Sequence, residues 1–175
     1  MAGGEDFNEV VFEDVVVPKD RIVGDAGNGW AQVTSELAYE RSGPERFLSA
    51  FRVFVELVRF CGPKPTQYQA TVIGRIASHI MTLRRMSISV AGMLESGKDV
   101  VVEAALVKEL GNNFEKLLPE LARAVGSDGF SDFSHDSDLF RRTFEDTMLL
   151  SPSFTLRGGT REILRGVIAR GLGLR

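Results

Sequence analysis

The sequence predicts an all-α protein, an antiparallel bundle of the four-helix type, with a short β-strand or hairpin segment at its N-terminal end. Two observations predict the bundle: apolar residues recur three and four positions apart in long segments, and glycine or proline separates these segments. A third observation predicts the strand, because valines alternate loosely with acidic residues just before Pro18. At 175 residues the chain is long enough for one domain with a substantial core.

The N-terminal segment over residues 8–17 is the predicted strand. Its valines and Phe12 alternate with acidic and polar residues, and Pro18 ends it, so it forms one strand or two short ones around an acidic turn. A lone strand pair is not stable in water. We therefore expect this segment to need a sheet that the rest of the chain does not supply.

Two shorter helices are expected next. Asn28 follows a glycine-rich turn and can cap a helix over residues 30–41. Pro44 breaks this helix, because proline lacks the backbone donor and clashes with the preceding turn. A second helix is predicted over residues 45–60, before a clear stop at Gly62 and the prolines that follow it.

Two long helices are predicted to form the centre of the bundle. The first begins at Thr66 and Gln69, which have the spacing of a capping box, and reaches about residue 96. The second is capped by Asp99 and reaches about residue 125. Their apolar seams are expected to face the core: Ile76, Ile80, Leu83, Ser87, Val90 and Leu94 in the first helix, and Val107, Leu110, Phe114, Leu117 and Leu121 in the second.

The chain is expected to end with two more helices. A polar loop over residues 126–138 precedes a helix over residues 138–150, and Thr160 then caps a terminal helix. Gly158 and Gly159 leave the backbone bare just before that helix, and the N–H groups at a helix start can bind an anion or a cofactor. The same pattern also fits a tail helix that simply docks on the bundle.

Charge and composition exclude several classes of protein. Twenty-one basic and 24 acidic residues give a net charge of −3 without a dense basic run, which argues against a dedicated nucleic-acid binder. The chain has no apolar run of membrane-spanning length and no signal-peptide pattern, so we expect a cytoplasmic protein that does not bind membranes. The single cysteine, Cys61, cannot form an internal disulfide. His79 and His135 lack partners at ligand spacing, so no metal site is predicted.

Three segments together resemble the C-terminal part of the acyl-CoA dehydrogenase family. Residues 12–19, with the glycines that follow, are similar to the junction between its middle β-domain and its C-terminal helical domain. The segment Leu-Ala-Tyr-Glu-Arg over residues 37–41 matches the position of an acid–arginine or threonine–arginine pair. The segment Arg-Gly-Gly-Thr-Arg-Glu-Ile-Leu-Arg over residues 157–165 matches the family's terminal turn and helix. The resemblance implies that residues 1–26 are the end of the β-domain with a linker, and that residues 27–175 are the helical domain.

The resemblance implies a flavoenzyme that removes hydrogens from Cα and Cβ of an acyl-CoA thioester. In such an enzyme a carboxylate takes the α-proton while FAD accepts a hydride. Much of the family carries this carboxylate where Gly158 stands, and glycine cannot act as a base. A subset that includes isovaleryl-type enzymes carries it where Glu40 stands. Glu40 is thus the implied base and Arg41 a substrate-binding residue, whereas the residues alone also fit an ordinary surface ion pair.

The resemblance also implies the cofactor contacts and the partners. Gly159 and Thr160 match residues that approach the flavin, and the region of Arg59 and Gly62 matches residues that reach the flavin of a neighbouring subunit. The implied partners are an acyl-CoA substrate, an electron-transfer flavoprotein or similar acceptor, and other subunits of a homo- or hetero-oligomer that pairs through the two long helices.

The sequence is compatible with three interpretations of the function. We expect the C-terminal, FAD-contacting and oligomerisation domain of an acyl-CoA dehydrogenase, excised or truncated and inactive alone, because the family's preceding domains are missing from 175 residues. The alternative is a catalytically silent scaffold or partner subunit of a heteromeric acyl-CoA dehydrogenase, in which Glu40 and Thr160 are only structural. A third reading is an unrelated helical bundle that binds a small ligand.

Overall fold

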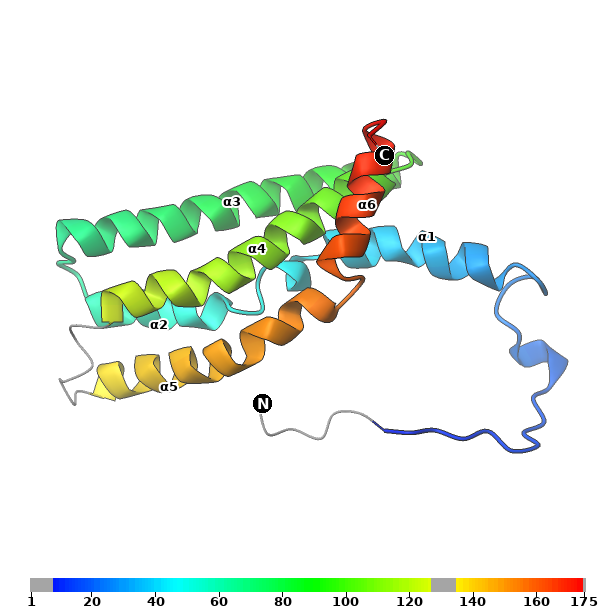
Figure 1. The fold of residues 1–175 in the computed structure, drawn as a ribbon, viewed down its shortest axis with the longest axis horizontal. Helices are drawn as coiled ribbons and strands as arrows, with labels where there is room; N and C mark the ends of the chain where they lie inside the picture. The colour runs from blue at the N-terminus through cyan, green and yellow to red at the C-terminus, as the bar shows by residue number, and fades with distance from the viewer. Residues whose placement is uncertain (1–7, 127–134, 175) are drawn as a thin grey trace.

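The computed structural model describes residues 8–126 and 135–174, and every regular element in these ranges is helical (Figure 1). The all-α fold class is therefore confirmed. The long elements are α1 (Gly29–Ser42), α2 (Phe51–Cys61), α3 (Gln67–Glu95), α4 (Val101–Gly126), α5 (His135–Leu150) and α6 (Arg161–Gly171). Three short 3₁₀ helices connect them: η1 (Lys19–Arg21), η2 (Pro44–Arg46) and η3 (Ser151–Leu156).

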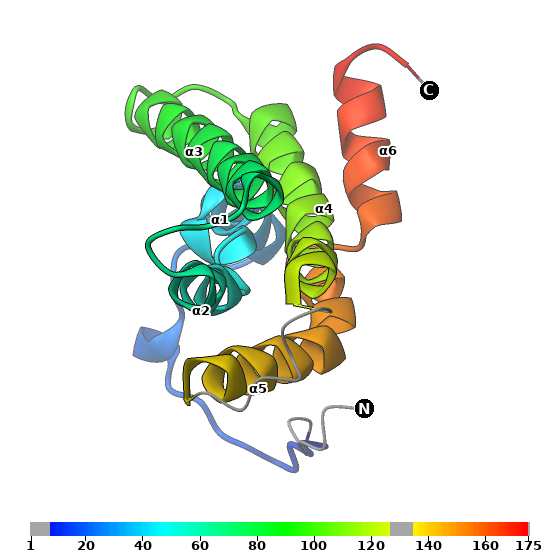
Figure 2. The same cartoon turned by 90° about the vertical axis from the view of Figure 1, so that its left-hand side faces the viewer.

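Helix α4 lies at the centre of the packing. It contacts every other α-helix as well as η2 and η3, and it pairs along its length with the antiparallel α3 (Figure 1). Helix α2 packs mainly on α5, while α6 stands on the side of α4 that faces away from α3 (Figure 2). The predicted bundle thus takes the form of a set of helices arranged around one central helix.

The sequence of α4 explains why it can be central. Its buried residues include small and apolar ones on several sides, such as Ala104, Val107, Phe114 and Leu118, which is typical of a helix surrounded by protein. At Gly111 the backbone of η2 approaches so closely that a Cβ would overlap the carbonyl oxygen of Arg46. Glycine therefore lets η2 cross α4, and this crossing places Arg46 beside the end of α1.

Helix α3 begins and packs as predicted. The Thr66 hydroxyl accepts from the Gln69 N–H at 3.2 Å, and the Gln69 side chain accepts from the Thr66 N–H at 2.8 Å, which completes the capping box. Ile76, Leu83 and Val90 of the predicted seam are buried. In the core they meet Phe47, Val53 and Leu57, which precede or belong to α2.

Three predictions need correction. Residues 8–18 form no strand and are exposed, because the part of the chain that the structure describes offers no strand to pair with. Helix α2 begins at Phe51, since η2 and a short turn occupy the residues just after Pro44. Leu110 of the predicted α4 seam is 44% exposed, because it lies at the outer edge of the contact with α3. Leu118 takes a core position instead and is fully buried.

The last predicted elements lie partly outside the described residues. Most of the predicted loop over residues 126–138 is not described, whereas α5 and α6 both form. In the described ranges no helix has both the length and the apolar character needed to cross a membrane.

Candidate functional site

Glu40 and Gly158 meet where the end of α1 reaches the turn between η3 and α6. A Cβ built on Gly158 would lie 2.9 Å from Glu40 Oε1 and 3.8 Å from Arg46 Cζ. The φ angle of Gly158 is +69°, a left-handed value that favours glycine. The carboxylate of Glu40 therefore occupies space next to the position where a side chain at residue 158 would begin.

Arg46 binds Glu40 through two contacts. Its Nε donates to the Glu40 carbonyl oxygen at 2.9 Å, and its Nη2 forms an ion pair with Glu40 Oε1. The Arg46 side chain is nearly buried, whereas the Glu40 side chain is 35% exposed. A carboxylate that is ordered by an arginine yet still open on one side can exchange a proton with a molecule bound there.

Arg41 ties α1 to the terminal turn. Its Nε donates to the Gly158 carbonyl oxygen at 3.1 Å, a contact between residues 117 positions apart. Burial lowers the pKa of the Arg41 guanidinium, and the neighbouring charge of Glu40 partly offsets this effect. Arg41 was expected to bind substrate, and in this structure its Nε binds the turn that lies against Glu40.

The start of α6 presents bare backbone, as the two glycines predict. Gly159 has a φ of +104°, and Thr160 occupies the N-cap position without a side-chain bond to a backbone N–H of the first turn. The pKa of the Glu162 carboxyl in this turn is lowered by a hydrogen bond from its own backbone and then by one from Thr160. Thr160 thus marks the helix start, although its hydroxyl does not make the expected cap.

The other two predicted cofactor residues lie elsewhere. Arg59 and Gly62 are at the far end of α2, where the chain turns into α3 (Figure 1). Arg59 Nη1 pairs with the buried Glu56 at 2.8 Å, and Gly62 ends the helix with a φ of +64°. The structure therefore brings Glu40, Arg41, Gly159 and Thr160 together at one end of α1 and leaves this pair apart from them.

A buried polar row on α4 supports the terminal turn and was missed by sequence reasoning. Lys108, Asn112 and Glu115 are completely buried, although the seams were read as apolar. Glu115 accepts from the Ser49 N–H at 2.9 Å and from Arg157 Nη2 at 3.3 Å, while Arg157 also lies over the Phe154 ring. The spacing of the row, four and then three residues, is a helical periodicity that the sequence does contain.

The terminal turn fits a bound flavin. Its two glycines project no side chain, and their positive φ angles turn the backbone in ways that other residues rarely adopt. The backbone N–H groups at the start of α6 add favourable dipoles for a polar group held close to the turn.

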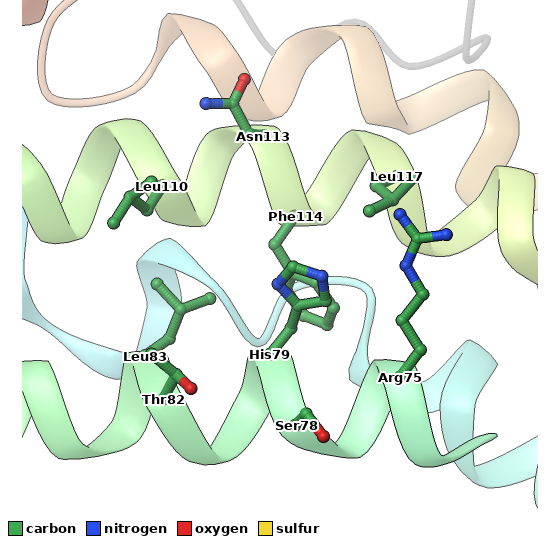
Figure 3. A pocket seen from close by; sticks show the side chains of 9 residues that line it. All are labelled: Arg75, Ser78, His79, Thr82, Leu83, Leu110, Asn113, Phe114 and Leu117. Atoms are coloured by element: carbon green, nitrogen blue, oxygen red, sulfur yellow. The ribbon is translucent and has the colours of Figure 1, made fainter. Parts of the chain in front are cut away.

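A separate hollow of about 530 Å³ lies between α3 and α4. Figure 3 shows Leu110 and Leu117 along one side and Arg75 and His79 along the other, with the His79 ring stacked on Phe114 at 5.5 Å between centroids. None of the predicted site residues lines it. This hollow lies on the pair of helices through which oligomer contacts were predicted.

Comparison with known proteins identifies the family. The family model for the C-terminal domain of acyl-CoA dehydrogenases matches residues 27–173. The chain is 28% identical over 181 residues to the acyl-CoA dehydrogenase IpdE1 of Mycolicibacterium smegmatis, covering 99% of this chain and 44% of that protein. It is 26% identical over 173 residues to the acyl-CoA dehydrogenase FadE34 of Mycobacterium tuberculosis, covering 98% of this chain and 23% of that protein. The chain thus spans less than half the length of these curated relatives.

Solved structures share the fold. The acyl-CoA dehydrogenase from Geobacillus kaustophilus superposes with a TM-score of 0.71 at 21% identity, over 93% of this chain and 44% of that one. A Mycobacterium smegmatis structure described as a candidate acyl-CoA dehydrogenase gives a TM-score of 0.74 at 22% identity, over 94% and 44% of the two chains. The match of the C-terminal domain model to residues 27–173, most of the chain, shows that the chain belongs to the acyl-CoA dehydrogenase family.

Proposed function

We propose that this chain serves as the C-terminal domain of an acyl-CoA dehydrogenase in which Glu40 is the catalytic base. One observation carries the proposal: the Glu40 carboxylate lies directly against Gly158, the residue at the family's other base position. The two alternative positions of the base therefore meet in one place. A single carboxylate there, supplied by Glu40, is enough to serve the same reacting atom.

The surroundings of the neighbouring carboxylates favour Glu40 over them. Glu115 is completely buried with both oxygens bonded, and Glu109 is nearly buried between Arg161 and Arg165. Neither can reach a substrate without breaking these bonds. Glu40 keeps part of its side chain exposed while Arg46 orients it, and a general base needs both access and orientation.

The proposed reaction is the α,β-dehydrogenation of an acyl-CoA thioester. Glu40 removes the α-proton, which the thioester carbonyl makes acidic, and holds that proton on its carboxylate. Bound FAD supplies the acceptor for the hydride that leaves the β-carbon. Arg41 keeps the Gly158 carbonyl in place, so that the turn with Gly159 and Thr160 forms one wall of the site.

The remaining contacts are proposed on the family likeness. The family generally binds FAD, and we place Gly159 and Thr160 against the flavin of the same subunit. Arg59 and Gly62, which lie at the other end of α2, would approach the flavin of a neighbouring subunit. This arrangement requires an oligomer, and the exposed side of the α3–α4 pair is the proposed place for its contacts.

The proposal is tested on the protein as its own host makes it, with any chain that co-purifies. The flavin spectrum is recorded during anaerobic addition of a panel of acyl-CoA esters to the parent, to Glu40→Gln and to Glu36→Gln, an exposed glutamate on the same helix. We expect the parent and Glu36→Gln to lose flavin absorbance, and Glu40→Gln to keep its flavin and lose no absorbance.

Two other outcomes would contradict this assignment. If Glu40→Gln is reduced at the parental rate, the base is another group. If the parent binds no flavin, or binds it without reduction by any ester, the chain is a scaffold or partner subunit that contributes only an interface.

A further inference from the structure

Lys108 is a completely buried lysine at the centre of α4. Its Nζ donates to Asn112 Oδ1 at 2.7 Å and to the Phe154 carbonyl oxygen at 3.2 Å. In the described part of the chain no carboxylate lies within ion-pair distance of this ammonium. Burying a charge without a direct counter-charge costs free energy. An apolar side chain of similar length at this position would give a more stable fold. The charge thus calls for an explanation other than stability.

The contacts of Lys108 point toward the candidate site. Phe154 belongs to η3, the turn that leads directly into Gly158 and Gly159. Two helical turns further along α4, Glu115 accepts a hydrogen bond from Arg157, the residue just before these glycines. Two buried residues of the central helix thus hold the same short segment, one by its carbonyl and one by its side chain. On its other side this segment meets the Glu40 carboxylate.

We propose that Lys108 is a positioning residue for the Glu40 site, holding the Phe154 carbonyl so that the turn through Gly158 and Gly159 stays fixed against the Glu40 carboxylate. The inference rests on the proposed function, because it assigns Lys108 to the same site. Lys108 touches neither substrate nor cofactor and acts only through the turn.

The charges around Lys108 make its hydrogen bond to the Phe154 carbonyl depend on pH. The pKa of Lys108 is lowered to about 8, mainly by burial and then by the positive charges of Arg46 and Arg157, while the negative charges of Glu115 and Glu40 partly oppose this shift. These groups come from α1, η2, α4 and the end of η3, the elements packed around this ammonium. As the pH rises through about 8, Lys108 loses its proton and its bond to the Phe154 carbonyl loses its charge assistance. The turn is then expected to open more often.

Limited trypsin digestion tests the positioning role of Lys108 without reference to catalysis. The protein is used as its own host makes it. The cleavage rate after Arg157, in the held turn, is compared with the rate after Arg21, in the exposed segment before α1. In Lys108→Met we expect cleavage after Arg157 to rise on the order of tenfold or more, and cleavage after Arg21 to stay at the parental rate. In the parent, the ratio of the two rates should rise between pH 7 and 9, and in Lys108→Met it should not.

Catalysis supplies the second readout. A turn displaced from Glu40 is expected to lower kcat by roughly tenfold to a hundredfold while KM changes little, since a small misplacement at a reacting centre costs mainly rate. Lys108→Arg keeps the charge and should recover part of the loss. If Lys108→Met does not fold, Lys108→Gln replaces it, because the amide is neutral and still fits a polar contact.

The outcomes separate this inference from the proposed function. Parental cleavage after Arg157 in a folded Lys108→Met or Lys108→Gln protein overturns the positioning role, whatever Glu40 does. Faster cleavage after Arg157 that is fully matched by a loss of unfolding free energy in urea also overturns it, because it shows a general loss of stability. If Glu40→Gln retains turnover, the proposed function fails. The ratio of cleavage after Arg157 to cleavage after Arg21 still shows whether Lys108 holds the turn.

Discussion

Gly158 sets how closely the terminal turn approaches Glu40. Its positive φ angle and the 2.9 Å separation between a built Cβ and Glu40 Oε1 are two independent reasons for glycine at this position. The first reason concerns the backbone and applies at any left-handed position. The second concerns the carboxylate alone, so a substitution can separate the two.

Gly158→Ala is expected to lower activity as well as stability, whereas Gly97→Ala lowers stability only. Gly97 has a similar φ of +74°, but a Cβ there meets nothing within 4 Å. Both variants should lose about 1 kcal/mol of unfolding free energy, the usual cost of a left-handed alanine. Urea unfolding and flavin reduction measure the two effects. Parental reduction rates in Gly158→Ala would show that the Glu40 carboxylate is not held at this turn.

Leu118 and Leu110 give a matched pair of core and surface positions on α4. Leu118 is fully buried, so Leu118→Ala should lower the free energy of unfolding by about 2–5 kcal/mol. Leu110 is 44% exposed, so Leu110→Ala should lower it by less than about 1 kcal/mol. Urea unfolding of dilute, monomeric protein measures both values. A large loss in Leu110→Ala under these conditions would contradict the observed packing of α4.

At the scale of elements, two contacts position the parts that form the site. The first is the crossing of η2 over α4 at Gly111, which brings Arg46 to Glu40. The second is the docking of α6 on α4, where Arg161 and Arg165 bind Glu109 and Leu164 is buried. Each contact predicts its own effect of mutation or pH.

Gly111→Ala is expected to destabilise the protein by about 1–3 kcal/mol, because its Cβ would force the backbone of η2 away from α4. Gly92 is the control, since it lies within α3 and a Cβ there meets nothing. Gly92→Ala should raise stability by about 0.5–1 kcal/mol through better helix propensity. Thermal and urea unfolding compare the two variants. Equal effects of both substitutions would mean that η2 does not cross at Gly111.

The docking of α6 is expected to weaken in acid. Burial raises the pKa of Glu109, but the hydrogen bonds from Arg161 and Arg165 outweigh it and leave the pKa below its ordinary value. A carboxyl with a lowered folded-state pKa stabilises the fold above its unfolded pKa of about 4.3, and this contribution is lost as pH falls through the folded value. The stability difference between the parent and Glu109→Gln should therefore shrink below about pH 4. Urea unfolding from pH 3 to 7 measures it, with the exposed Glu120→Gln as control. A difference that does not change with pH would contradict the account.

Particular elements show what the sequence could predict. Helix α3 was located because its cap, Thr66 with Gln69, and its apolar period are both local features. The start of α2 was misplaced, because η2 exists through a tertiary contact with Gly111 that no local pattern reveals. Glu40 and Gly158 could be paired only through the family resemblance, since they are 118 positions apart. Lys108 was missed because a lysine in a helix is ordinarily read as solvent-exposed.

At the scale of the whole molecule, the chain presents surfaces that its own residues do not cover. Residues 8–28, before α1, are exposed, Val16 included, and the surface that lines the hollow between α3 and α4 is mostly apolar. The chain spans less than half the length of its curated relatives. These facts agree with a domain whose proposed site is completed by cofactor, substrate and neighbouring protein.

The measurement that tests the central claim most directly is the rate constant for anaerobic flavin reduction by an acyl-CoA substrate in the parent and in Glu40→Gln. The account predicts that Glu40→Gln binds flavin normally and is reduced at least about a hundredfold more slowly, the scale of a lost general base. Reduction of Glu40→Gln at the parental rate would contradict it.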